Sequence, residues 1–325
     1  MTALRCLVGI LAIVAAATAS SAQDAVKFPT KSVRLIVPAV AGGPVDAVAR
    51  ILADALKTSW SQTIVVESKP GAGNSTGAIY VAQSPPDGHT LLVISDSITI
   101  NPSLYPNLDK DPLKQFEGIS VLITAPQVLI ARRDIGVANL REFIELAKGA
   151  RSPINVASAG SGTISHLTQV LLEQRTGVTS SHIPFRGAAP AVTAVMGGHV
   201  DAAWVMPAPA LASIAAGQLK ALAVTSAARD PSLPTVATAE ESGVPNFQIM
   251  NWQGLFAPAK TPQPVVEHIA KAVAEALKRP EVVARLAAIG FEARGDGPKA
   301  AAAQVRTNVI RWAEVLRKAG IKAAD

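Results

Sequence analysis

Two glycine-containing loops are the stretches of this sequence best suited to hold an anion. The first, Pro38–Gly43, follows the apolar run Val33–Val37, and the second, Ala159–Thr163, follows the run Ile154–Ser158. A pattern of helical spacing comes directly after each loop. A strand, a glycine-rich loop and a helix start, in that order, direct backbone N–H groups and the positive helix end toward one point. The sequence therefore predicts two anion-binding corners.

The two loops differ in the side chains around them. Asp46 stands in the first helical turn after the first loop, where it stabilises the helix but adds negative charge near the proposed anion. The second loop has no carboxylate before Glu173 and carries several hydroxyl groups, which can bind a ligand or cap the helix. The candidate ligand-binding residues of the two loops are Val40, Ala41, Gly42, Gly43 and Asp46, and Ser158, Gly160, Gly162, Thr163 and His166.

Signatures of catalysis are missing from the sequence. It contains no G-x-S-x-G, S-x-x-K or P-loop motif, and its five histidines are not spaced as metal ligands. Asp46 and Asp201 could form an acid–base pair only if the fold joined them; the other interpretation is a helix-start carboxylate and a turn residue. These observations favour a binding protein without catalytic residues, metal or cofactor. A periplasmic enzyme acting through Asp46 or His166 is the least supported alternative.

Length and composition indicate a folded protein of two domains. The chain has 325 residues, of which 49% are hydrophobic and 17% charged. The net charge is +6, but aromatic residues make up only 4% and the basic residues are scattered, which argues against nucleic-acid binding.

The first 22 residues have the pattern of a secretory signal peptide. Arg5 precedes the apolar segment Leu7–Ala19, and Ser20–Ala22 supplies small residues for cleavage after Ala22. We therefore expect a periplasmic protein. The single cysteine, Cys6, would leave with the signal peptide, so the mature chain would have no disulfide.

Strands and helices alternate along the rest of the chain, which predicts α/β architecture with a parallel sheet. Ligands of such sheets bind beyond the carboxyl ends of the strands. Ser95 and Ser97 follow the predicted strand Leu91–Ile94 and are therefore further candidates. The long apolar stretch Val121–Ala131 could run from one lobe to the next, and Trp252–Ala257 could return. The glycine-rich segment Glu67–Gly77 is interpreted as a turn before a helix.

Nine segments occur in an order that identifies a family resemblance. They include PAVAGGPVDAVAR, SPPDGHTLLV, INPSLY, SAGSGTISHL and HIPFRGAAPAV. From about Phe28 to its end the chain resembles the Bug-type periplasmic solute-binding receptors of tripartite tricarboxylate transporters. The resemblance implies a two-lobed type II periplasmic binding protein, or Venus flytrap, with its ligand in the cleft between the lobes. We expect lobe 1 to comprise residues 23–123 and 251–325, and lobe 2 to comprise residues 124–250.

The resemblance also implies the ligand class and the partners. The ligand would be a small carboxylate (a dicarboxylate, tricarboxylate or aromatic acid) held by backbone N–H groups, hydroxyls and waters. The receptor would be a monomer that delivers its ligand to membrane permease subunits. A periplasmic receptor that feeds a signalling partner is the alternative, and the genes beside this one would discriminate between the two.

The sequence departs from the family pattern at two places. The family's usual Tyr-Lys is Phe185-Arg186 here, so Arg186 could bind a carboxylate, or could simply be solvated. Gly187 and Ala188 of the same turn are candidates as well. An apolar segment containing Trp204 and Met206 replaces a polar pair, which suggests a ligand with an apolar body; the alternative is that these residues belong to the core.

Overall fold

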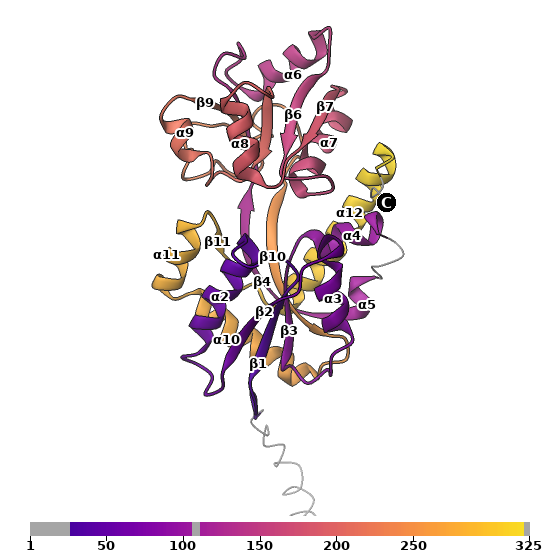
Figure 1. The fold of residues 1–325 in the computed structure, drawn as a ribbon, viewed down its shortest axis with the longest axis vertical. Helices are drawn as coiled ribbons and strands as arrows, with labels where there is room; N and C mark the ends of the chain where they lie inside the picture. Colours follow the sequence, from indigo (N-terminus) through magenta and orange to yellow (C-terminus); the bar gives the residue numbers. More distant parts are fainter. Residues whose placement is uncertain (1–26, 106–110, 322–325) are drawn as a thin grey trace, which may run out of the picture.

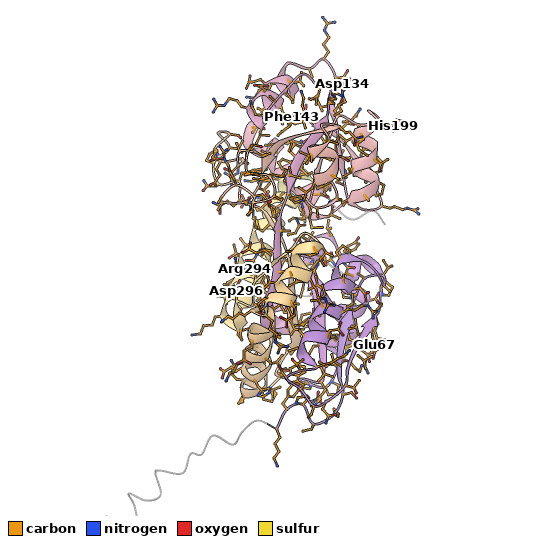
Figure 2. The ribbon with its side chains drawn as sticks, turned by 90° about the vertical axis from the view of Figure 1, so that its left-hand side faces the viewer. Glu67, Asp134, Phe143, His199, Arg294 and Asp296 are labelled. Atoms are coloured by element: carbon orange, nitrogen blue, oxygen red, sulfur yellow. The ribbon has the colours of Figure 1, made fainter. Side chains whose placement is uncertain are left out.

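The computed structural model describes residues 27–105 and 111–321 as two lobes stacked end to end (Figure 1). The proposed signal peptide, residues 1–22, lies outside the described residues. Lobe 1 is built on a six-stranded sheet of order β11-β4-β10-β3-β1-β2, and lobe 2 on a five-stranded sheet of order β7-β6-β8-β5-β9. Side chains fill both lobes, and Figure 2 shows Asp134, Phe143 and His199 in lobe 2 and Glu67, Arg294 and Asp296 in lobe 1.

The strands of lobe 1 are β1 (Val33–Val37), β2 (Ile64–Ser68), β3 (Thr90–Ser95), β4 (Phe116–Pro126), β10 (Met250–Pro258) and β11 (Glu292–Ala293). The strands of lobe 2 are β5 (Val128–Arg132), β6 (Ile154–Ser158), β7 (Ser180–Pro184), β8 (Ala202–Val205) and β9 (Leu219–Val224). The expected parallel pairing is confirmed for β1 with β2 and β3, and for β6 with β7 and β8. The strands that cross between the lobes are antiparallel to their neighbours, so both sheets are mixed.

Helices cover both sheets. Those of lobe 1 are α2 (Pro44–Leu56), η1 (Ala72–Asn74), α3 (Ser75–Ala82), α4 (Ser97–Leu104), α5 (Pro112–Gln115), α10 (Gln263–Leu277) and α11 (Pro280–Ala288). Those of lobe 2 are α6 (Leu140–Gly149), α7 (Ile164–Thr176), α8 (Ala188–Met196) and α9 (Leu211–Ala215). Helix α4 was not expected, because its sequence contains Pro102 and lacks an amphipathic pattern.

Alternation along the strands explains why helices pack on both faces of each sheet. In β1, Leu35 and Val37 belong to one core cluster together with α2 and α10, whereas Ile36 belongs to a second cluster on the other face. In β5, Leu129 and Ile130 likewise belong to different clusters. Successive strand side chains point to opposite faces, so a strand that is apolar throughout needs cover on both.

The chain crosses between the lobes at two neighbouring points. Strand β4 leads directly into β5 through Gln127, and the segment after β9 returns to β10. Thr225 ties the two crossings together: its hydroxyl accepts the Gln127 N–H at 2.8 Å and donates to the Ile249 carbonyl. Its own N–H donates to the Gln127 carbonyl at 2.9 Å. This arrangement confirms that Val121–Ala131 runs from one lobe to the next and that the chain returns through β10.

Helix α12 (Gly297–Ala319) bridges the two lobes (Figure 1). Its N-terminal half packs in lobe 1 through Ala301 and Val305. Its C-terminal half carries Trp312 into the core cluster of lobe 2, and Gln174 of α7 donates to the Val315 carbonyl at 3.0 Å. The predicted lobe boundaries stay a prediction, but this helix belongs to both bodies.

Two properties of the described residues bear on function. No helix there is long and apolar enough to span a membrane. Within the same residues, no group of three or more His, Cys, Asp or Glu side chains is arranged to hold a metal ion.

Candidate functional site

A cavity of about 310 Å³ lies between the two lobes. Lobe 1 contributes the carboxyl end of β3, the start of α4 and the loop at Asn74, and lobe 2 contributes the loop before α7. Residues at the crossings complete its wall. A pocket at the carboxyl ends of strands, lined by both lobes and of this volume, has the size and position of a small-molecule site.

The first of the two predicted corners, residues 38–46, is closed by its own side chains. The carboxylate of Asp46 accepts the Gly42 N–H at 2.9 Å and two hydrogen bonds from Arg50, at 2.8 and 3.1 Å. The Arg50 guanidinium holds the pKa of Asp46 below its usual range. The Gly43 N–H donates to the Val40 carbonyl. Asp46 therefore supports the loop and is already neutralised by Arg50.

The second corner, residues 158–166, repeats this geometry with a different acceptor. His166 Nδ1 accepts the Gly162 N–H at 3.1 Å, four residues before it, as Asp46 does for Gly42. Its ring stacks on His182, with centroids 3.7 Å apart and planes 10° apart. Burial, with a smaller contribution from His182, lowers the pKa of His166 to about 4. This acceptor is therefore an uncharged imidazole at neutral pH.

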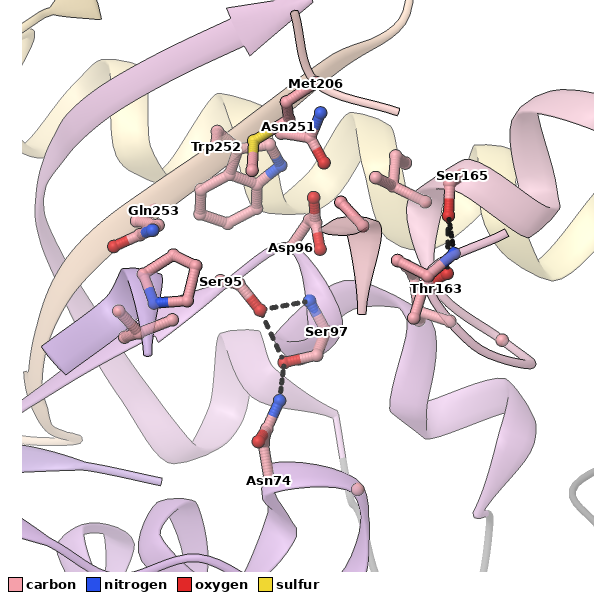
Figure 3. Close-up of a pocket in the computed structure, with 18 of the residues that line it drawn as sticks. Asn74, Ser95, Asp96, Ser97, Thr163, Ser165, Met206, Asn251, Trp252 and Gln253 are labelled. Atoms are coloured by element: carbon pink, nitrogen blue, oxygen red, sulfur yellow. Dashed lines mark hydrogen bonds between the residues drawn. The ribbon is translucent and has the colours of Figure 1, made fainter. Parts of the chain in front are cut away.

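Hydroxyl groups organise the rest of the second corner. Ser165 Oγ accepts the Ala159 N–H at 2.9 Å and lies 2.9 Å from Thr163 Oγ1 (Figure 3). Ser158 Oγ accepts the Gly160 N–H at 3.1 Å and lies 2.7 Å from His182 Nε2. Several loop N–H groups that the sequence assigned to an anion thus donate within the loop itself.

Six of the predicted ligand-binding residues line the cavity: Ser95, Ser97, Gly162, Thr163, Ala188 and Met206. On the lobe 1 side, Ser95 Oγ donates to Ser97 Oγ, and the Asn74 amide donates to the same oxygen, both at 3.1 Å (Figure 3). The remaining predicted residues support these walls or lie elsewhere. They are Val40, Ala41, Gly42, Gly43, Asp46, Ser158, Gly160, His166, Arg186, Gly187 and Trp204.

Two of these placements agree with the alternatives that the sequence left open, a core Trp204 and a solvated Arg186. Trp204 is fully buried, its indole N–H donates to Gln169 at 2.9 Å, and its ring packs near Phe247 in the core of lobe 2. Alternation along β8 turns its neighbour Val205 to the other face, and Val205 lines the cavity instead. Arg186 is exposed in the turn before α8 and does not line the cavity.

The proposed acid–base pair is not assembled. Asp46 lies on α2 in lobe 1, whereas Asp201 precedes β8 in lobe 2 and accepts hydrogen bonds from Arg132 and the Asn155 N–H. Each carboxylate is paired with an arginine of its own lobe.

Sequence reasoning missed several cavity residues. Asp96 stands between the two predicted serines, at the end of β3, and its position there was a usable signal. Asn74 lies in a loop that was interpreted only as a turn. Gln127, Asn251 and Gln253 lie at the crossings, where only the paired strands show that they share one cavity.

Comparison with known proteins identifies the relatives of this chain. The model of the family described as tripartite tricarboxylate transporter family receptor matches residues 48–321. A protein of Pseudomonas sp. (strain P51), "UPF0065 protein in tcbD-tcbE intergenic region", is 34% identical over 96% of this chain and 93% of its own length.

Solved structures agree with that match. The periplasmic binding protein BugD is 37% identical, with a TM-score of 0.76 over 91% of this chain and 100% of its own. MatC from Rhodopseudomonas palustris with bound malate is 34% identical (TM-score 0.75; 89% and 100% coverage), and R. palustris Rpa4515 with adipate is 29% identical (TM-score 0.78; 91% and 100%). Family match, sequence identity and shared two-lobed architecture together show that the chain belongs to the tripartite tricarboxylate transporter receptor family of solute-binding proteins.

Proposed function

We propose that this protein is a periplasmic receptor that captures a small organic carboxylate and presents it to the membrane subunits of a tripartite transporter. The observation that carries the proposal is the cavity between the lobes, lined by hydroxyl and amide groups from both. Two relatives of this fold hold malate and adipate. The N-terminal segment 1–22 would direct export and be removed.

The walls of the cavity suit a small acid. The loops of both corners lie at helix starts, and Pro44 and Val45 of α2 and Thr163–Ser165 at α7 face the cavity. Helix N-termini carry partial positive charge and N–H groups without intrahelical partners, so they stabilise a carboxylate without a lysine or arginine. Bridging waters can complete such contacts at little cost.

Closure of the lobes would follow from contacts to both walls at once. The two lobes, with the predicted boundaries 23–123 plus 251–325 and 124–250, would move about the crossings at Gln127 and Thr225. A ligand that touches both lobes binds the closed form more tightly than the open form and shifts the population toward it.

The test is a thermal-shift screen of the chain from Gln23 against dicarboxylates, tricarboxylates, aromatic acids and amino acids. A ligand at a hundredfold excess over its Kd stabilises the folded state by about 2.7 kcal/mol. Small-angle scattering with the best ligand should show a smaller radius of gyration. Binding without any change in scattering would overturn the closure step, and no binding of any carboxylate would overturn the receptor proposal.

A further inference from the structure

Asp96 brings a carboxyl group into the cavity, and no described residue is a charged partner for it. It follows β3 directly and is only 7% exposed. Figure 3 shows its carboxyl group between the Trp252 ring and the Thr163–Ser165 loop. Its backbone carbonyl, rather than its side chain, accepts the Thr99 N–H at 2.9 Å at the start of α4.

Burial raises the pKa of Asp96 to about 7, although backbone hydrogen bonds from Trp252 and Ser97 oppose the rise. Among the described residues that line the cavity there is no Lys, Arg or His. Tyr105 is the other titratable lining group, and β10 and the crossing at Gln127 present only uncharged side chains. His166 lies behind the facing loop, where its low pKa keeps it neutral.

Two further acceptors in the same wall have no hydrogen-bond partner within residues 27–105 and 111–321. The side-chain oxygens of Gln127 and Gln253 are buried and make no hydrogen bond, and these residues are only 1% and 4% exposed. Both residues line the cavity with Asp96. The indole N–H of Trp252 in the same wall is also buried without a partner among the described residues. A buried polar group without a partner costs free energy, so this wall favours a ligand that supplies N–H donors as well as an acceptor.

Charge decides which kind of donor fits. A plain dicarboxylate would add negative charge beside Asp96, and the described lining residues include no cation, so Asp96 would have to keep its proton. A cationic N–H group instead restores the ionised Asp96 and offers donors to the neighbouring oxygens. An ammonium group has three such donors, which satisfies one carboxylate and two amide oxygens.

We infer that the ligand is an amino-carboxylate, a zwitterion whose cationic N–H group pairs with Asp96 while its carboxylate lies toward the hydroxyl-rich walls. This inference rests on the proposed function, because it names the ligand class of the same cavity. It assigns to Asp96 the role of selecting for the cation.

The experiment compares matched compounds by titration calorimetry at pH 7.5. The sets are succinate, aspartate and propylamine, and adipate, 6-aminohexanoate and hexylamine. The amino-carboxylate of at least one set should bind more than tenfold more tightly than its dicarboxylate and its amine. Asp96→Asn should weaken that binding on the order of 100-fold, because it removes one partner of a buried charge pair.

Asp134→Asn is the matched control. The Asp134 side chain is 79% exposed on lobe 2, away from lobe 1 (Figure 2). This variant should bind every compound as the parent does. The melting temperature of the unliganded Asp96→Asn protein should be no lower than that of the parent, because an amide needs no burial of charge.

The pH dependence gives a second readout with opposite signs for the two ligand classes. An amino-carboxylate needs Asp96 ionised, so its affinity should fall roughly 20-fold between pH 7.5 and 5.5 in the parent and stay level in Asp96→Asn. A dicarboxylate that needs Asp96 protonated should bind more tightly at pH 5.5.

The outcomes separate the two proposals. If a dicarboxylate binds as well as its amino partner and Asp96→Asn does not weaken binding, the zwitterion inference is wrong and the carboxylate receptor stands. If only the amines bind, the cation role of Asp96 stands and the carboxylate proposal fails. If no compound of either set binds, the inference is wrong for these classes, and the wider screen decides the receptor proposal.

Discussion

In both corners that face the cleft, the side chain four residues after a glycine accepts the N–H of that glycine. The two accepting side chains differ in charge. In corner 1 (residues 38–46) a carboxylate accepts the Gly42 N–H and is neutralised by Arg50; in corner 2 (residues 158–166) a neutral imidazole does the same for Gly162. Val170 occupies the position of corner 2 that corresponds to Arg50. In corner 1 the charge of the buried acceptor is therefore balanced by an arginine one turn further along the helix, whereas corner 2 avoids the charge altogether.

The largest expected difference between the two corners is in how stability depends on pH below neutrality. The pKa of His166 is lowered from 6.5 to about 4, so between these values the unfolded chain binds a proton that the folded chain does not. His166 should therefore contribute a loss of stability of roughly 3 kcal/mol as pH decreases from 6.5 toward 4, whereas Asp96, whose pKa is raised to about 7, binds a proton on folding and contributes in the opposite direction over this range. His166→Gln, which keeps an uncharged acceptor, should lose the His166 contribution, which denaturant unfolding measures as the difference in the slope of stability against pH between this variant and the parent.

His199→Gln on the exposed surface of lobe 2 is the control and should keep the slope (Figure 2). Corner 1 behaves differently, because the pKa of Asp46 is lowered in the folded state. The stabilisation that the ionised Asp46 gives is therefore fully present above the ordinary pKa of an aspartate. That contribution should disappear only as pH falls below about 4. An unchanged slope in His166→Gln would show that His166 is not the group responsible.

The next largest effect is the loss of stability when the glycine of either corner, Gly42 or Gly162, is replaced by alanine. Gly42 and Gly162 have φ values of +80° and +73°, so alanine costs about 1–2 kcal/mol of left-handed strain at either position. A Cβ at Gly42 meets open space, whereas one at Gly162 would lie 2.5 Å from Leu104 Cδ1 of α4, across the cleft. Gly162→Ala should therefore cost about 1–3 kcal/mol more than Gly42→Ala in denaturant unfolding.

Because Leu104 belongs to lobe 1, the strain in Gly162→Ala can also be relieved by separating the lobes. Small-angle scattering should show a larger radius of gyration for this variant and no change for Gly42→Ala. Equal behaviour of both variants would mean that the two glycines differ in sequence position only.

A smaller effect separates the hydroxyls of corner 2 from the apolar residues of corner 1. Ser165 accepts the Ala159 N–H, whereas Val45 stands at the corresponding position of corner 1. Ser165→Ala should cost about 1 kcal/mol in denaturant unfolding, because the Ala159 donor loses its partner. Ser161→Ala at the exposed tip of the same loop should cost less, and a larger loss there would reverse the assignment.

The smallest effect is expected for Asp46→Asn. The amide oxygen still accepts the Gly42 N–H, and the lost partner Arg50 is 56% exposed, where solvent screens the ion pair. The melting temperature should fall slightly at low ionic strength and less in 0.5 M salt. A large, salt-independent loss would show that the charge of Asp46 matters more than its hydrogen bond.

Local patterns in the sequence were enough to predict both corners and most strands, because a strand, a loop and a helix start follow one another within 25 residues. Asp96 carried no such pattern: a lone carboxyl between two serines becomes informative only when β10 and the crossings bury it. The sequence left the position of Trp204 open, between the cavity and the core, for the same reason. Its face of β8 depends on the pairing with β5, and residues far away in the chain fix that pairing.

The order of strands in lobe 1 also determines when this protein can fold. Strand β10 lies between β3 and β4, yet it follows all of lobe 2 in the chain. The first three strands therefore cannot complete their sheet until more than three quarters of the polypeptide is available for folding. Pairing between strands so far apart in the chain slows folding. In pulse-labelled hydrogen exchange, the amides of β3 that bond to β10 should become protected together with those of β10, whereas the β3 amides that bond to β1 can become protected earlier.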